Sequence, residues 1–120
     1  MIRLDGVRKT FTAGETQIHA LDGVSLEIER GEFVAIMGQS GSGKSTMMNI
    51  IGLLDRPDDG AYLLSGQNVA GLSEHARARL RGTAFGFVFQ SYSLLPRMSA
   101  LEQVELPLIY KGVRDRRRRA

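Results

Sequence analysis

The sequence predicts an α/β fold that begins with an antiparallel group of strands. Val24, Leu26 and Ile28 alternate with polar residues, which is typical of an antiparallel strand with one exposed face. Residues 33–37 are apolar at every position, which is typical of a parallel strand covered on both faces. A glycine-rich loop and a helical segment follow directly, so strands and helices alternate along the chain.

The first half of the chain divides into five predicted elements. Strands are expected at residues 2–10, 20–28 and 33–37. A helix is expected from Lys44 to about Leu53, and it ends before the turn-forming cluster at residues 55–60. A further short strand follows at residues 61–65.

The second half contains two predicted helices and one predicted strand. Ser73 is a suitable N-cap for a basic helix that runs to about Arg81. The apolar residues 84–89 form the next predicted strand. Ser99 and Glu102 have the spacing of a capping box, which predicts a helix from there through Tyr110.

Residues 38–46 match the pattern G-x-x-x-x-G-K-[ST] of a phosphate-binding loop. A backbone that wraps a phosphate needs dihedral angles that glycine reaches at little cost, and the loop has three glycines. Lys44 places an ammonium against the β and γ phosphates, and the helix that begins there directs its positive end at the same anion. The Ser45 hydroxyl suits Mg²⁺. The motif predicts a site for a nucleoside triphosphate with Mg²⁺.

Composition excludes several other classes of protein. The 120 residues are enough for one domain, or part of one, and include no cysteine, so a disulfide framework and a thiolate metal site are excluded. The N-terminus does not have the pattern of a signal peptide, and no apolar run approaches the ~18 to 20 residues that span a bilayer. We therefore expect the chain to face the reducing cytoplasm.

The net charge of +3 comes from the C-terminal end of the chain. Residues 114–119 alone carry +4, which leaves the first 113 residues at −1. This arginine run contains no aromatic residues, so we interpret it as the solvated face of a helix and expect no specific nucleic-acid partner. Non-specific phosphate binding by the run is the alternative.

Three segments together resemble the ATPases of ABC transporters, and nearly the whole chain takes part in the resemblance. They are residues 31–60, the strand that ends in Gly-Phe-Val-Phe-Gln at 86–90, and the run from Leu94 to Val104. Within that family the chain is most similar to the ATP-binding subunits of the macrolide-export and lipoprotein-release group. The resemblance implies that residues 1–120 are the N-terminal part of one nucleotide-binding domain. Residues 1–90 are then the antiparallel β and P-loop core, and residues 90–120 are the Q-loop and the start of the helical subdomain.

The resemblance also assigns roles to individual residues. Phe11 matches the aromatic that stacks on adenine, and Gln90 matches the glutamine that reaches Mg²⁺ and the attacking water. The implied catalytic residues are Lys44 and Gln90, and the implied Mg²⁺ ligands are Ser45 and Gln90. The implied nucleotide-binding residues are Phe11, Gly38, Gln39, Ser40, Gly41, Ser42, Gly43, Lys44, Ser45 and Thr46. The implied permease-coupling residues are Gln90, Ser91, Tyr92, Leu94 and Leu95.

The family's other catalytic motifs have no counterpart in this sequence. The signature motif, the acidic strand that holds Mg²⁺ and the catalytic glutamate would lie beyond residue 120. We therefore expect the fold to stop before the helical subdomain is complete, and the chain by itself to hydrolyse ATP poorly or not at all.

In the family, two such domains close head to tail around ATP and drive a transmembrane permease. The resemblance thus implies an ATPase subunit at the cytoplasmic face of the inner membrane, with a permease and a second ATPase subunit as partners, that powers export or lipoprotein release. Two alternatives stay open. One is another P-loop enzyme such as a kinase or GTPase, although no N-K-x-D motif is present. The other is a non-catalytic interaction module.

Overall fold

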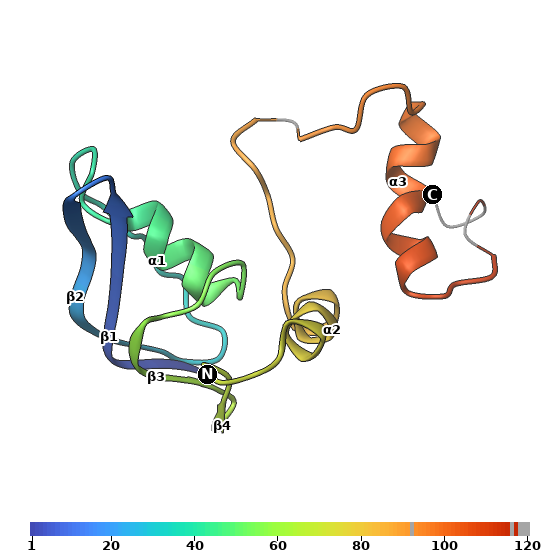
Figure 1. The fold of residues 1–120 in the computed structure, drawn as a ribbon. Coiled ribbons are helices and arrows are strands. Elements are labelled where there is room, and N and C mark those ends of the chain that lie inside the picture. Colours follow the sequence, from blue (N-terminus) through green and yellow to red (C-terminus); the bar gives the residue numbers. More distant parts are fainter. Residues whose placement is uncertain (92, 116, 118–120) are drawn as a thin grey trace. The chain divides into compact units, whose positions relative to one another are not determined.

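The structure is a computed structural model that describes residues 1–91, 93–115 and 117. It divides into two compact units, Met1–Phe85 and Gly86–Ala120. Figure 1 shows the elements of each unit. The first unit holds the strands β1 (Ile2–Ala13), β2 (Thr16–Ile28), β3 (Asp59–Leu64) and β4 (Gln67–Asn68), and the helices α1 (Lys44–Ile51) and α2 (Glu74–Ala84). The second unit holds the helix α3 (Ala100–Tyr110).

The four strands form one antiparallel sheet in the order β2-β1-β3-β4. The predicted strands at 2–10 and 20–28 are confirmed, and both are longer than predicted. Ala13 pairs with Thr16, so a turn of only two residues joins them. Because backbone pairing continues up to that turn, the polar ends of both strands join the sheet although their side chains give no apolar pattern.

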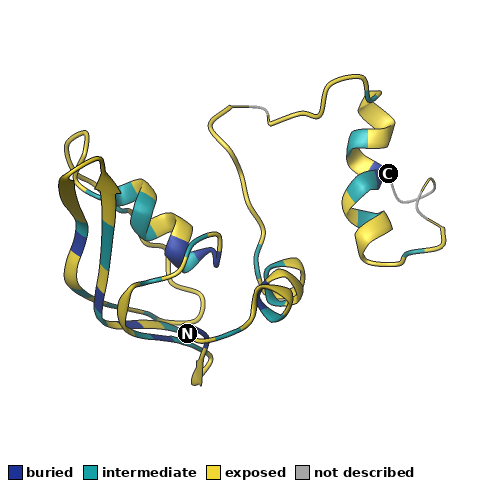
Figure 2. Ribbon diagram, in the orientation of Figure 1, coloured by how far each residue is buried: buried dark blue, intermediate teal, exposed yellow. Residues whose placement is uncertain are grey.

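The core of the first unit lies where α1 and the turn after it meet the sheet. Ile50 of α1 is fully buried, and Leu4, Val7 and Leu21 of the two long strands pack in the same cluster. Tyr62 of β3 completes it, with its hydroxyl donating a hydrogen bond of 2.6 Å to the Ile51 carbonyl oxygen. Figure 2 shows buried positions on α1 and on the strands beside it. The sheet thereby holds the last turn of α1 in place.

Two predicted strands are wrong. Residues 33–37 and 84–89 are not strands of the sheet: Ala84 is the last residue of α2, and residues 85–89 form no strand. Phe33 and Val88 are highly exposed, at 94% and 102%. A strand is defined by hydrogen bonds to a neighbouring strand, and an apolar run alone does not supply that neighbour.

The predicted helix starts are confirmed. The Ser73 hydroxyl accepts a hydrogen bond from the Ala76 amide at the start of α2. In the second unit, Ser99 and Glu102 form a complete capping box, and the Ser99 amide donates to the Glu102 carboxylate over 2.7 Å. This hydrogen bond holds the pKa of Glu102 below its usual value. Among the described residues, no helix has the length and apolarity needed to cross a membrane.

Candidate functional site

The glycine-rich loop leads directly into α1, as the sequence predicts. Gly43 is the N-cap of the helix, with a positive φ of 82°, and no side chain caps it. The first backbone hydrogen bond of the helix runs from the Met47 amide to the Gly43 carbonyl, over 2.9 Å. Within the described part of the chain, the amides of residues 44–46 therefore have no acceptor. Such a cluster of amides at a helix N-terminus favours an anion.

The Lys44 ammonium lies over the same loop. Its Nζ donates to the carbonyl oxygens of Gly38 and Gln39, over 2.8 and 2.6 Å, and to the Ser42 hydroxyl over 3.3 Å. The loop curves around the ammonium, so the charge is held beside the amides of the helix N-terminus. Positive charge from the lysine and from the helix dipole thus converges on one place.

The loop also packs closely against β2. A Cβ atom built on Gly43 would collide with the Ala20 carbonyl oxygen and lie 3.1 Å from the Leu21 Cδ2 atom. Glycine is required here for two reasons, its positive φ and the close approach of another strand. The sequence pattern indicated only the first reason.

A cavity of about 220 Å³ lies between this loop and the β1–β2 hairpin. The residues that line it are Phe11, Ile18, His19, Ala20, Gly41, Ser42, Gly43, Lys44, Ser45 and Thr46. The structure therefore brings Phe11 together with most of the predicted phosphate loop, although Phe11 and Lys44 are 33 positions apart in the sequence. Gly38, Gln39 and Ser40 belong to the same loop but do not line the cavity.

Three lining residues were not predicted from the sequence. Ile18, His19 and Ala20 come from β2, and Ile18 pairs directly with Phe11 across the hairpin. His19 Nδ1 lies 3.0 Å from the Thr10 hydroxyl. The strand predicted at 20–28 included Ala20 but stopped short of Ile18 and His19. The two-residue turn, once recognised, would have placed these residues opposite Phe11.

The predicted Q-loop and permease-coupling residues belong to the second unit. Gln90 and Ser91 are exposed, and Leu94 and Leu95 are 66% and 47% exposed. Gln103 of α3 holds Leu95 by two hydrogen bonds, one from the Leu95 amide over 3.2 Å and one to its carbonyl oxygen over 2.6 Å. Tyr92 lies outside the described residues.

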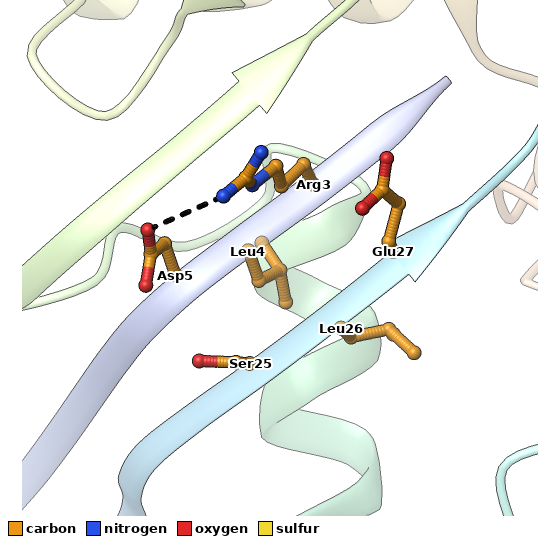
Figure 3. Close-up of a pocket in the computed structure, with 6 residues that line it drawn as sticks. All are labelled: Arg3, Leu4, Asp5, Ser25, Leu26 and Glu27. Carbon is orange, nitrogen blue, oxygen red and sulfur yellow. Dashed lines mark ion pairs between the residues drawn. The ribbon is translucent and has the colours of Figure 1, made fainter.

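A second hollow, of about 280 Å³, lies on the sheet and contains none of the predicted residues. Arg3, Leu4 and Asp5 of β1 and Ser25, Leu26 and Glu27 of β2 line it. Figure 3 shows these six side chains and the ion pair of 3.8 Å between Arg3 and Asp5. Two carboxylates and one guanidinium do not favour an anion. The smaller cavity, which is lined by Lys44, therefore suits a phosphate better than this hollow does.

The donor set around Lys44 also suits Mg²⁺. The described residues contain no cluster of three or more His, Cys, Asp or Glu side chains that could hold a metal ion. A hydroxyl such as that of Ser45 fits Mg²⁺, because this ion takes one or two protein oxygens and completes its shell with phosphate and water oxygens.

The family comparison agrees with this geometry. Residues 21–120 match the family model described as ABC transporter. The chain belongs to the ABC transporter family. This ABC chain shares 55% identity over 112 residues with a macrolide export ATP-binding/permease protein of Nitrobacter winogradskyi. It shares 55% identity over 114 residues with a pyoverdine export ATP-binding/permease protein of Pseudomonas fluorescens. These alignments cover 93% and 94% of the chain and 17% of each relative, so the ABC chain spans about a sixth of their length.

Two solved structures have the same fold as this ABC chain. One is a dimeric structure of the bacterial ABC transporter cassette MJ0796, with a TM-score of 0.90 and 48% identity. The other is a dimeric structure of a post-hydrolysis state of that cassette bound to ADP and Pi, with a TM-score of 0.91 and 47% identity. Each match covers 99% of the ABC chain and 53% of the cassette. The predicted fold class, a P-loop α/β core with an antiparallel β subdomain, is confirmed.

Proposed function

We propose that this chain is the ATP-binding part of an ABC exporter ATPase, in which ATP binding and hydrolysis drive transport. The observation that carries the proposal is the cavity shared by Phe11 and the phosphate loop, with Lys44 at its edge. An aromatic ring and a cationic loop on one cavity suit the two ends of a nucleotide.

The proposed roles follow the positions of the side chains. The adenine ring stacks on Phe11, which is 43% exposed at the cavity. The amides of residues 44–46 and the Lys44 ammonium receive the β and γ phosphates. The Ser45 hydroxyl holds the Mg²⁺ ion, which when bound neutralises charge on those phosphates. Lys44 is the catalytic residue of the loop, because it stabilises charge that develops on the transferred phosphoryl group.

We also propose that residues 1–120 belong to one nucleotide-binding domain. Residues 1–90 are its antiparallel β and P-loop core, and residues 90–120 are the Q-loop and the first part of its helical subdomain. Gln90 then contributes to Mg²⁺ binding and to catalysis once the domain is assembled. Its exposure supports this role, because the side chain is available to a ligand.

Residues 90–95 are the proposed contact with a transmembrane permease. Leu94 and Leu95 expose large apolar side chains, and the two hydrogen bonds between Leu95 and the Gln103 side chain hold the backbone of Leu95 in a defined conformation. An exposed and ordered apolar pair suits a protein partner better than solvent. Ser91 and Tyr92 complete this proposed surface.

The matched proteins support the proposed assembly and location. The relatives are ATP-binding/permease proteins for macrolide and pyoverdine export, and the matched cassette structures are dimers. We therefore propose a second ATPase subunit in a head-to-tail dimer, and a location at the cytoplasmic face of the inner membrane through the permease. The proposed activity is export or lipoprotein release.

Calorimetry of Mg-ATP binding tests the proposal. The Lys44→Ala variant removes one of the two converging positive charges, and we expect its Kd to rise at least about tenfold. Lys111→Ala is the matched control, because it removes an exposed lysine of the second unit. Circular dichroism confirms that each protein is folded. Folded wild-type protein that binds no Mg-ATP would contradict the proposal, as would equal affinities of the two variants.

A further inference from the structure

The Lys9 ammonium lies in a pocket of oxygen atoms beside the proposed adenine site. Its Nζ donates to Asp55 Oδ1 over 3.0 Å, to the Arg56 carbonyl oxygen over 2.8 Å and to Asp58 Oδ1 over 3.3 Å. All three ammonium protons thus have an acceptor, and the side chain is only 12% exposed. Burial acts to lower the pKa of Lys9, but the hydrogen bonds to the two carboxylates outweigh it and raise that pKa.

The same carboxylate of Asp58 also holds the backbone next to Phe11. Its Oδ2 accepts a hydrogen bond of 2.7 Å from the Thr10 amide. This bond holds the pKa of Asp58 below its usual value. The turn after α1 is therefore tied to β1 at two successive residues, Lys9 and Thr10, immediately before Phe11.

Lys9 stands over the ring of Phe11, with Nζ 5.5 Å from the ring centroid. Lys9 and Phe11 are two residues apart in β1, and this contact places both side chains on one side of the strand. A cation at this distance is attracted to the ring and restricts its orientation. With one ring face covered by Lys9, a base that stacks on Phe11 uses the other face.

We propose that Lys9 is a positioning residue for nucleotide binding, which fixes the Phe11 ring so that its free face receives the base. The ammonium touches neither the base nor the phosphates. Asp55 and Asp58 hold the ammonium in place, so the turn after α1 contributes to base binding although it does not line the cavity. This inference rests on the proposed function and identifies a support of that same site.

Binding of two ligands distinguishes the contribution of the base from that of the phosphates. Calorimetry compares Mg-ATP with Mg-tripolyphosphate, which lacks the base and the sugar. For Lys9→Met we expect the Kd of Mg-ATP to rise about fivefold, because the variant keeps an aliphatic side chain and loses the cation. The Kd of Mg-tripolyphosphate is expected to stay within about twofold of the wild-type value, because the loop around Lys44 is unchanged.

Three variants make the comparison specific. Arg8→Met is the matched control, because Arg8 is the preceding residue of β1 and pairs with the exposed Asp22; it should change neither affinity. Lys9→Arg keeps a cation for the ring and should recover most of the affinity for Mg-ATP. Asp58→Asn keeps Lys9 but weakens the interaction that holds its ammonium, so it should also raise the Kd of Mg-ATP. If Lys9→Met does not fold, the Kd of Asp58→Asn tests the proposal in its place.

If Lys9→Met weakens the binding of Mg-ATP and of Mg-tripolyphosphate equally, the proposal is wrong, because Lys9 then acts on the loop or on the fold as a whole. The proposal is also wrong if the variant binds both ligands as tightly as wild type does. Wild-type protein that binds neither ligand would contradict the proposed function itself, and this inference with it. If the wild-type protein binds both ligands and Lys9→Met weakens the binding of Mg-ATP alone, the result supports both the proposed function and this inference.

Discussion

The guanidinium of Arg77 donates a hydrogen bond of 2.7 Å from Nη2 to the carbonyl oxygen of Leu53. The same nitrogen donates to the Asp55 carbonyl oxygen over 2.6 Å. Arg77 is only 4% exposed, and Leu53 has a positive φ of 57°, which is uncommon for a leucine. An arginine of α2 therefore stabilises the turn that ends α1, the helix that carries the phosphate loop.

The variant Arg77→Met should destabilise the first unit by about 1 to 3 kcal/mol. It leaves the Asp55 carbonyl oxygen without its donor, and the Leu53 carbonyl oxygen keeps only the hydrogen bond from Arg81. It also removes a buried charge from its partner Glu74. Urea denaturation followed by circular dichroism measures the change. Arg79→Met is the control, since Arg79 is exposed on the same helix; its effect should stay within about 0.5 kcal/mol. Similar values for the two variants would show that the Leu53 turn is stable without Arg77.

The variant Gly43→Ala should lower the free energy of unfolding by about 3 kcal/mol or more. Its Cβ would collide with the Ala20 carbonyl oxygen, and alanine is strained at this positive φ. Gly41→Ala is the matched variant, because Gly41 has a similar φ of 80° but open space where the Cβ would lie. It should cost only about 1 kcal/mol. Thermal unfolding measures both. If the two costs are equal, close packing of β2 on the loop does not constrain residue 43.

The stability of the protein should fall at alkaline pH through Tyr62. Burial raises the pKa of Tyr62 to about 12, above its ordinary value near 10. In the unfolded chain the phenol therefore loses its proton first, and the unfolded state is favoured as the pH rises from about 10 to about 12. The expected loss is about 2 kcal/mol across that window.

The variant Tyr62→Phe removes both the titration and the hydrogen bond to Ile51. It should be less stable than wild type at pH 7 by about 1 to 2 kcal/mol, because the Ile51 carbonyl loses its donor. Denaturant titrations at several pH values should show that this difference shrinks above about pH 10. A difference that stays constant with pH would mean that Tyr62 titrates like an exposed tyrosine.

The local signals in the sequence correctly predicted the helix starts and the position of the glycine-rich loop before α1. Ser99 and Glu102 form the capping box that their spacing indicates, and α1 begins at Lys44. These features depend on residues within a few positions of one another. Helix caps and glycine loops are therefore determined by local sequence.

The apolar runs at 33–37 and 84–89 were predicted less well. Each run has the composition of a buried strand, yet neither belongs to the four-stranded sheet of the described residues. A single run of apolar residues indicates that the segment tends to be buried, but it does not indicate which other segment pairs with it. Strand formation is for this reason a property of the tertiary structure.

By itself, the sequence determined the glycine-rich loop and the helix that follows it, because the required residues lie next to one another, and it predicted the type of ligand. Only the tertiary structure decided that Phe11 lines the same cavity as Lys44, and that Lys9 stands over the Phe11 ring within reach of Asp55 and Asp58. Apart from the local contact of Lys9 with Phe11, these relationships join residues that are 33 to 49 positions apart. They depend on how the hairpin and the turn after α1 pack around one core, and a local stretch of sequence does not specify that packing.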